Sequence, residues 1–285
     1  MSTAAAPSAP ALPEAGTIMS QAGAENFPVA SRLLGARYRR PLLAIYGFAR
    51  LVDDTGDEAA GDRVALLDEI EAQLEGIYAG RAPAHAVMRE LAWAVRACAL
   101  PEGPFRRLVQ ANRRDQLVTR YQTFEELLDY CQLSAAPVGE LVLHVFGAAT
   151  PQRVALSDRV CAGLQVIEHL QDVGEDYARG RVYLPAEELA AAGCAESELG
   201  APVTSPPLRA VVAQLAGRCG SMLEAGAPLV RELRGRPRLA VAGFVAGGRS
   251  TLAAIEAARY DVLGVAARRS RRGFALAALK AVIGR

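Results

Sequence analysis

The stretch "LQVIEHLQDVGEDYARGRVYLP", residues 164–185, decides the fold class. It begins as an amphipathic helix and then carries a cluster of carboxylates near the expected end of that helix. Apolar residues in its first half recur at three- and four-residue spacing, which is the period of an α-helix. Asp172 and Asp176 then stand four residues apart, with Glu168 one turn earlier. Side chains at this spacing share one helix face, about 6 Å apart, and like charges there destabilise the helix. The acidic end is therefore either a solvated surface or a binding site for cations.

An earlier predicted helix ends in the same way. In "LVDDTGDE", residues 51–58, Asp53 and Asp57 are also four residues apart. Negative charge near a helix C-terminus opposes the macrodipole, so each pair costs roughly a few tenths of a kcal/mol. Mg²⁺ offsets such a cost, since it binds one or two carboxylates together with water and substrate phosphates. Two pairs of equal spacing favour Mg²⁺, or Mn²⁺ in its place, bound with a diphosphate; solvated helix ends are the alternative.

Helical periodicity continues through most of the chain. Apolar residues keep this spacing in the segments 40–58, 62–78, 86–99, 104–117, 123–147, 153–178, 207–233 and 238–264. Proline and glycine separate these segments, and no convincing alternating strand pattern accompanies them. The pattern predicts an all-α bundle. Pro137 interrupts the segment 123–147 and predicts a kink, which either borders a cavity or only shapes the packing.

Composition limits the class of function. The chain has 285 residues, 51% of them hydrophobic, and a net charge of +1. It can therefore bury a large core, and it offers no global attraction for nucleic acid. Five cysteines without a CxxC pair predict free thiols rather than a disulfide framework or a zinc site.

The ends and the location of the chain are predicted from the same composition. No uninterrupted apolar run of about 18 residues occurs, so no transmembrane helix is predicted and a cytoplasmic location is expected. Residues 1–24 are rich in Ala, Pro and Ser, which predicts a disordered leader before one folded domain over 25–285.

Four segments, in order, resemble the squalene/phytoene synthase family of head-to-head prenyl-diphosphate enzymes. "AIYGFARLVDDTGDE" and "LQDVGEDYARGRVYLP" are similar to its two aspartate-rich motifs. "RRDQLVTRYQTFEELLDYCQLSAAPVGE" lies between them, and "RSTLAAIEAARYDVLG" is similar to the closing helix. The resemblance covers residues 25–272. It implies a single-domain isoprenoid-synthase-type helical bundle around a central apolar cavity, and a prenyl-diphosphate-processing synthase or lyase.

The resemblance also implies roles for individual residues. The Mg²⁺ ligands would be Asp53, Asp57, Asp172 and Asp176. Arg50 matches an arginine that contacts the diphosphate, for which its planar fork is suited. The aromatic positions near the reacting carbons correspond to Tyr46, Tyr130 and Tyr183, and the cavity positions to Val138, Gly139 and Gln165. Asp115 and Arg120 match further substrate-binding positions, with a structural ion pair as the alternative.

Two departures from the usual family pattern bear on the reaction. Asn26 and Phe27 stand where a Ser-rich segment is typical, and they resemble the hopanoid-pathway members that convert presqualene diphosphate to hydroxysqualene. Glu168 stands where many relatives have Asn. We therefore expect Mg²⁺-dependent diphosphate release and capture of the carbocation by water, without NADPH. Phe27 would contact the substrate, and Asn26 or Glu168 would position the water.

Other functions and partners stay open at this point. The alternatives are condensation of two farnesyl diphosphates to presqualene diphosphate, phytoene or squalene synthesis, and, more distantly, a non-catalytic all-α binding protein. The resemblance implies presqualene or farnesyl diphosphate as substrate and functional coupling to other squalene-pathway enzymes. An apolar product also predicts peripheral contact with the inner face of a membrane.

Overall fold

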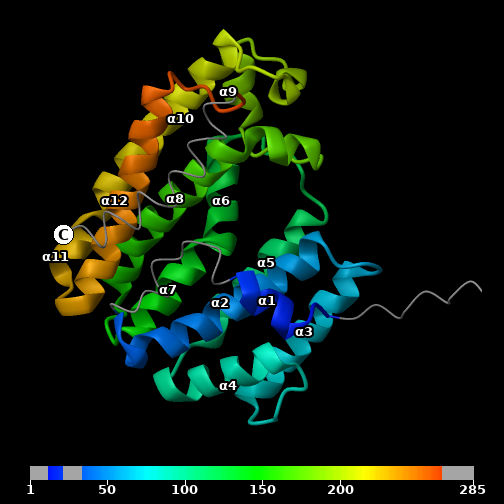
Figure 1. Ribbon diagram of the computed structural model, residues 1–285, viewed down its shortest axis with the longest axis vertical. Coiled ribbons are helices and arrows are strands. Elements are labelled where there is room, and N and C mark those ends of the chain that lie inside the picture. Colours follow the sequence, from blue (N-terminus) through cyan, green and yellow to red (C-terminus); the bar gives the residue numbers. More distant parts are fainter. Residues whose placement is uncertain (1–11, 22–33, 265–285) are drawn as a thin grey trace, which may run out of the picture.

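The computed structural model describes residues 12–21 and 34–264, and helices dominate it (Figure 1). In chain order they are α1 (Ala15–Gln21), α2 (Ala36–Asp57), α3 (Arg63–Tyr78), α4 (Ala86–Cys98), α5 (Glu102–Asp115), α6 (Phe124–Ser134), α7 (Ala136–Val145), α8 (Pro151–Ala178), α9 (Ala186–Ala191), the 3₁₀ helix η3 (Glu196–Gly200), α10 (Pro206–Gly226), α11 (Pro228–Glu232) and α12 (Gly235–Ala257). Within the described ranges, the sole strand-like pairing is one isolated β-bridge. The all-α prediction is confirmed.

The two acidic motifs close the two helices that shape the site. Thr150 caps the N-terminus of α8, where its side chain accepts a hydrogen bond from the Arg153 backbone N–H, and Pro151 is the first residue of the helix. Both residues are typical of a helix start. The backbone N–H groups of a first turn have no partner inside the helix: Thr150 supplies an acceptor for one of them, and proline has no N–H to satisfy. α8 then runs for 28 residues and carries its acidic motif in its last two turns. α2 runs for 22 residues and ends at Asp57.

The predicted single helix over 123–147 is wrong, because the chain breaks it at Ala135 into α6 and α7. Pro137 lies in the first turn of α7. A proline there gives up no intrahelical hydrogen bond, so it starts a helix instead of kinking one. The predicted segment 207–233 divides in the same way, with Pro228 opening α11.

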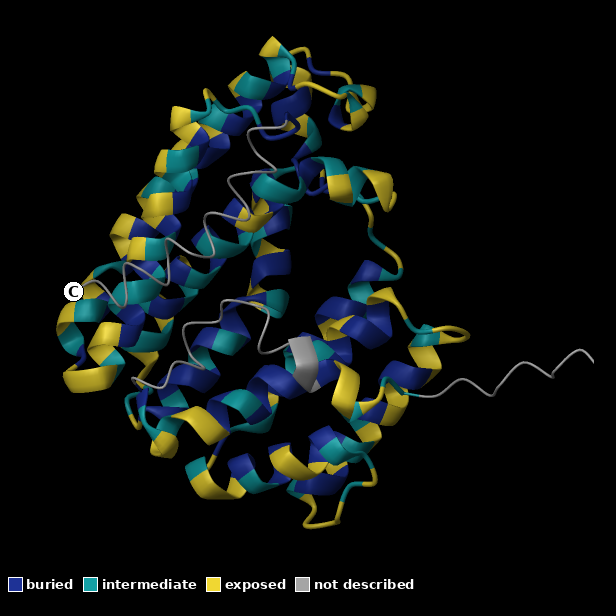
Figure 2. Ribbon diagram, viewed as in Figure 1, coloured by how far each residue is buried: buried dark blue, intermediate teal, exposed yellow. Residues whose placement is uncertain are grey.

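Two hydrophobic clusters form the core, and Figure 2 shows buried residues on the inward faces of the helices. The first cluster joins α2, α3, α4, α5 and α7, and the second joins α6, α8 and α10. α7 and α8 pack closely where Gly139 meets α8. A Cβ atom at Gly139 would overlap Ser157 Oγ and Cys161 Sγ, so glycine sets the distance between the two helices.

The predicted disordered leader is wrong for one segment, because residues 15–21 form α1. Ile18 is fully buried, and Leu12 and Ala15 pack against the first cluster. One buried isoleucine thus fixes a stretch whose composition otherwise resembles a linker. Residues 1–11 and 22–24 of the predicted leader lie outside the described residues.

α12 is, among the described helices, the one long and apolar enough to cross a membrane by length and composition alone. The sequence predicts a helix over 238–264, in which Arg238 and Arg249 interrupt the apolar residues. In the structure it packs against α8, α10 and α11 as a member of the bundle.

Candidate active site

The loops that follow α5 and α8 run side by side, and this pairing builds the site. The Val182 N–H donates to the Thr119 carbonyl at 2.9 Å, and the Ala186 N–H donates to the Tyr121 carbonyl at 2.9 Å. An isolated parallel bridge joins Arg120 to Val182. The backbone therefore holds the side chains that follow the second acidic motif beside the end of α5.

An ion pair joins the two acidic motifs. Arg181 Nη1 lies 2.7 Å from Asp57 Oδ1, and the Arg181 N–H donates to the Asp176 carbonyl at 2.9 Å. One residue thus connects the last aspartate of α2 with the last aspartate of α8, although 119 positions separate them (176 − 57). The sequence analysis missed Arg181. Its position in "GRVYLP", five residues after Asp176, was the available signal.

Asp53 lies one turn before Asp57 on α2 and is held by a side chain of α5. The Asn112 amide donates to Asp53 Oδ1 at 3.0 Å, and a Cβ on neighbouring Gly56 would overlap Asn112. The Asp53 side chain is open to solvent, yet the surrounding protein desolvates it and raises the pKa of its carboxyl to about 6. Asn112 was not among the predicted residues.

A buried acid and three aromatic rings occupy the space behind the ion pair. The Tyr130 hydroxyl donates to Asp115 Oδ2 at 2.7 Å, while Asp115 Oδ1 is buried without a hydrogen-bond partner. Burial outweighs the Tyr130 hydrogen bond and the nearby Arg181 charge, and raises the pKa of Asp115 to about 6. Tyr183 packs on Tyr130 and on Tyr121, with ring centroids 5.6 and 5.7 Å apart. Tyr121 was missed, since an isolated tyrosine indicates only core packing.

His169 links this aromatic group to α8. Its ring stacks on Tyr183 at 3.8 Å. Its Nδ1 lies 3.7 Å from Asp176 Oδ2, and its Nε2 lies 3.3 Å from the Gln165 amide nitrogen. Gln165, His169 and Asp176 therefore share one face of α8. The spacing of four and seven residues could have identified His169, which was not among the predicted site residues.

The side chain of Arg50 is held by Asp54, which does not belong to the predicted pair Asp53 and Asp57. Its guanidinium lies 2.7 Å from Asp54, and the Asp54 side chain is 8% exposed against 25% for Arg50. Tyr46, one turn earlier, is buried. Asp54 therefore orients Arg50, while Asp53 and Asp57 lie on the more open side of the helix.

Three further predicted residues make structural contacts. Arg120 pairs with Glu196 and donates to the Gly180 carbonyl at 2.6 Å. Gly139 separates α7 from α8, and Val138 packs on the first cluster. Their expected roles in substrate binding stay predictions.

Of the remaining predicted residues, the structure describes Asp172 and Glu168 but not Asn26 and Phe27. Asp172 is half-buried one turn before Asp176. Glu168 is exposed on α8, and burial, with a smaller effect of the Glu168 charge, raises the pKa of Cys161 to about 11. Asn26 and Phe27 lie outside the described residues.

The donor set suits a hard cation held partly by its substrate. Among the described residues, no group of three or more His, Cys, Asp or Glu side chains is placed so that it could hold a metal ion by itself. Mg²⁺ does not require one, because it keeps waters and binds one or two carboxylates with substrate phosphates. Asp53, Asp57, Asp172 and Asp176 offer oxygen ligands of that kind, and Asp53 is open to solvent.

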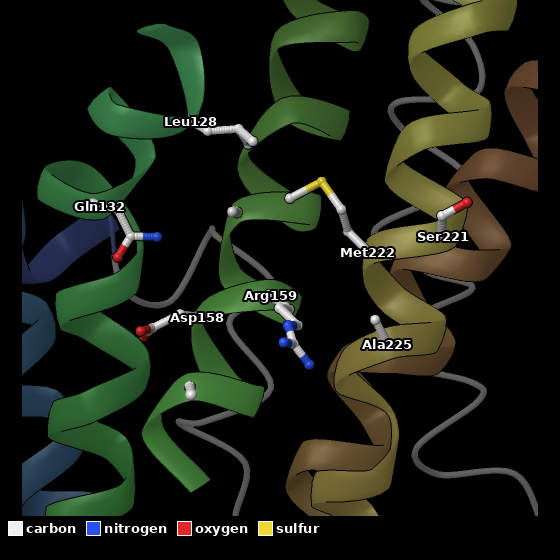
Figure 3. Close-up of a pocket in the computed structure, with 9 residues that line it drawn as sticks. Leu128, Gln132, Asp158, Arg159, Ser221, Met222 and Ala225 are labelled. Carbon is white, nitrogen blue, oxygen red and sulfur yellow. The ribbon is translucent and has the colours of Figure 1, made fainter. Parts of the chain in front are cut away.

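A cavity of about 480 Å³ lies elsewhere, between α6, α8 and α10 (Figure 3). Its walls include Leu128, Gln132, Asp158, Arg159 and Met222. None of the predicted site residues lines it, so it is distinct from the group of residues beside the acidic motifs. Burial raises the pKa of Asp158 to about 6.

Comparisons with known proteins agree with this geometry. The model of the squalene/phytoene synthase family matches residues 20–273. A hydroxysqualene synthase from Rhodopseudomonas palustris is 41% identical over 214 residues, which is 74% of this chain and 72% of the relative. One from Sinorhizobium fredii is 38% identical over the same shares.

Solved structures give the same fold. The squalene synthase of Alicyclobacillus acidocaldarius has 38% identity and a TM-score of 0.78, covering 86% of this chain and 94% of its own. A dehydrosqualene synthase in complex with a ligand has a TM-score of 0.82 at 24% identity, covering 94% and 93%, and supports the fold alone. Together with the helical bundle and its joined acidic motifs, these matches show a prenyl-diphosphate-processing enzyme that belongs to the squalene/phytoene synthase family.

Proposed function

We propose that this enzyme converts presqualene diphosphate to hydroxysqualene by Mg²⁺-dependent release of diphosphate and capture of the carbocation by water. The Arg181–Asp57 ion pair supports the proposal, because it joins the chain just after the second acidic motif to the last aspartate of the first motif. The relatives named hydroxysqualene synthase, 36–41% identical, support the choice of product.

Four aspartates and two arginines would bind the diphosphate. Asp53, Asp57, Asp172 and Asp176 would hold Mg²⁺, or Mn²⁺ in its place; the bound metal would neutralise the charge that develops on the departing diphosphate. Arg50 has its guanidinium fixed by Asp54, so it is oriented before the substrate arrives. Arg181 has donors beyond the one given to Asp57, and guanidinium groups suit diphosphate oxygens.

The buried tyrosines serve the cation left in the apolar part of the site. Tyr46, Tyr130 and Tyr183 are each less than a tenth exposed. Burial raises the pKa of Tyr130 well above its usual value, so the phenol stays neutral and offers a ring face instead of a nucleophilic oxygen. Cation–π attraction contributes about 2 kcal/mol per desolvated ring.

Water completes the reaction. The carbocation takes the oxygen of one water, a proton is lost, and hydroxysqualene and diphosphate are the products. Glu168, one turn before Asp172, or Asn26 positions this water. Product analysis of Glu168→Asn and Asn26→Ala tests the assignment, and unchanged hydroxysqualene from both variants would remove it.

The reaction itself is tested by incubating the purified chain separately with presqualene diphosphate and farnesyl diphosphate, without NADPH. We expect hydroxysqualene from presqualene diphosphate alone, dependence on Mg²⁺, and ¹⁸O in the product when the reaction runs in H₂¹⁸O. Presqualene diphosphate formed from farnesyl diphosphate, or no product from either substrate, contradicts the proposal.

Squalene synthesis is the second candidate, because the solved relative from Alicyclobacillus acidocaldarius is described as a squalene synthase. Reduction would then replace water capture. Adding NADPH to the same incubation distinguishes the two, since this candidate requires squalene to appear when the reductant is present. Under the first proposal a separate condensation of two farnesyl diphosphates must supply the substrate, which is the coupling to other squalene-pathway enzymes that we propose.

A further inference from the structure

Helix α2 carries opposite charges at its two ends. It begins with Arg37, Arg39 and Arg40, and it ends with the acidic group at 53–58. Positive charge at a helix N-terminus and negative charge at its C-terminus both oppose the macrodipole. Substrate binding accounts for the acidic end. The basic end lies about 24 Å from Asp53, at about 1.5 Å per residue, and the proposed reaction does not use it.

A second basic segment adjoins the start of α2. Arg236 Nη1 donates to the Leu34 carbonyl at 3.4 Å, and Gly35 is so near the Arg236 guanidinium that a Cβ atom would overlap it. The start of α12 therefore touches the start of α2, at the corner where α2, α11 and α12 meet in Figure 1. The segment 231–239, "RELRGRPRL", contains four arginines and one acid.

The charge of this segment is not neutralised locally. Glu232 is held by Arg153 at 3.1 Å. Arg231, Arg234 and Arg238 are exposed, and none has an acidic partner among the described residues. With a net charge of +1 for the whole chain, such a local surplus is a distinct surface feature and not the effect of a basic protein.

An exposed leucine completes the surface. Leu239 follows Arg238 in the first turn of α12 and is 70% exposed. Only 33% of the most apolar window of α12 is buried in the bundle, and Figure 2 shows exposed residues along this helix. We define the basic docking surface as Arg37, Arg231, Arg234, Arg236, Arg238 and Leu239.

We propose that the basic docking surface binds the anionic phospholipid surface of a membrane. A specific protein interface needs an apolar centre with matched pockets, whereas this surface offers one exposed leucine among arginines. An anionic bilayer requires only positive charge and a shallow apolar contact. The acidic end of α2 then points away from the lipid, since the same charge that attracts Mg²⁺ is repelled by anionic head groups.

Sedimentation of the full-length chain with vesicles tests this surface without any substrate. One vesicle set is phosphatidylcholine, and the other contains about one third phosphatidylglycerol, which gives an anionic surface. We expect binding to the anionic vesicles only, and a steep loss of binding as salt rises. Each arginine near such a surface strengthens binding about fivefold, so Arg234→Gln with Arg238→Gln should weaken it about 25-fold. Leu239→Ser should weaken it about tenfold.

A charge-matched control uses exposed arginines elsewhere, Arg81→Gln with Arg159→Gln. It should bind as the parent does, and unfolding curves confirm that all variants fold. The proposal is overturned if the parent ignores anionic vesicles, if the control loses as much binding as the test variant, or if the test variant binds like the parent. It stands apart from the proposed reaction, since vesicle binding and product formation are measured separately.

Discussion

The buried carboxyl of Asp115 should lower the stability of the folded protein when it is ionised. Asp115 is 8% exposed, one of its oxygens has no hydrogen-bond partner, and burial raises its pKa to about 6. The folded protein therefore holds a proton there more tightly than the unfolded chain, whose aspartates titrate near roughly 3.9. Asp115→Asn keeps an acceptor for the Tyr130 hydroxyl and removes the charge.

The size of the effect follows from the difference in pKa. A raised pKa means that the carboxyl costs no stability below about pH 4 and an increasing amount as the pH rises to about 6. About two pKa units correspond to about 3 kcal/mol above pH 7, and the same relation gives about 1.5 kcal/mol at pH 5. We therefore expect Asp115→Asn to be more stable than the parent by these amounts at the two pH values.

Urea unfolding followed by circular dichroism, in EDTA at pH 5 and pH 7, measures the difference. Asp129→Asn is the matched control, since Asp129 is an exposed aspartate on α6, and its stability should stay within about 0.5 kcal/mol of the parent. A variant less stable than the parent at pH 7, or a gain that does not change with pH, would show that Asp115 is not held at an energetic cost.

Three further substitutions test separate parts of the structure. Arg50→Gln removes the guanidinium that neutralises the buried Asp54 and should cost about 3 kcal/mol in urea unfolding; a neutral result contradicts the pairing. Gly139→Ala should cost about 1–3 kcal/mol, because the new methyl group overlaps side chains of α8; an unchanged midpoint refutes the close approach. Arg181→Gln should lower kcat/KM at least about tenfold, whereas its exposed neighbour Arg179→Gln should be silent.

Periodicity and charge alone predict the helices that carry the site. The spacing of apolar residues in 153–178 reproduces α8, and the repeated aspartate pairs mark the ends of α2 and α8. Local sequence predicts these features because a helix face is fixed by residues three and four apart. The break at Ala135 escaped prediction, since a proline in a first turn and a proline in a helix interior look alike in the sequence.

The contacts of the site were predicted less completely, because they depend on tertiary structure. Arg181 reaches Asp57 only because the loops after α5 and α8 pair, and no local pattern encodes that pairing. The same loops give Arg120 a partner in Glu196, which no local pattern indicates. His169 was recognisable in principle, but its stacking on Tyr183 is again a contact across the fold.

The convergence of carboxylates from both halves of the chain is tested most directly by a double-mutant cycle on diphosphate binding. Isothermal titration with inorganic pyrophosphate and Mg²⁺ is measured for the parent, Asp57→Asn, Asp176→Asn and the double variant. If both aspartates act through Mg²⁺ on one anion, the two losses are non-additive by at least about 1 kcal/mol, and the parent does not bind pyrophosphate in EDTA. Losses that add to within about 0.5 kcal/mol, or pyrophosphate binding that ignores Mg²⁺, would contradict a shared site.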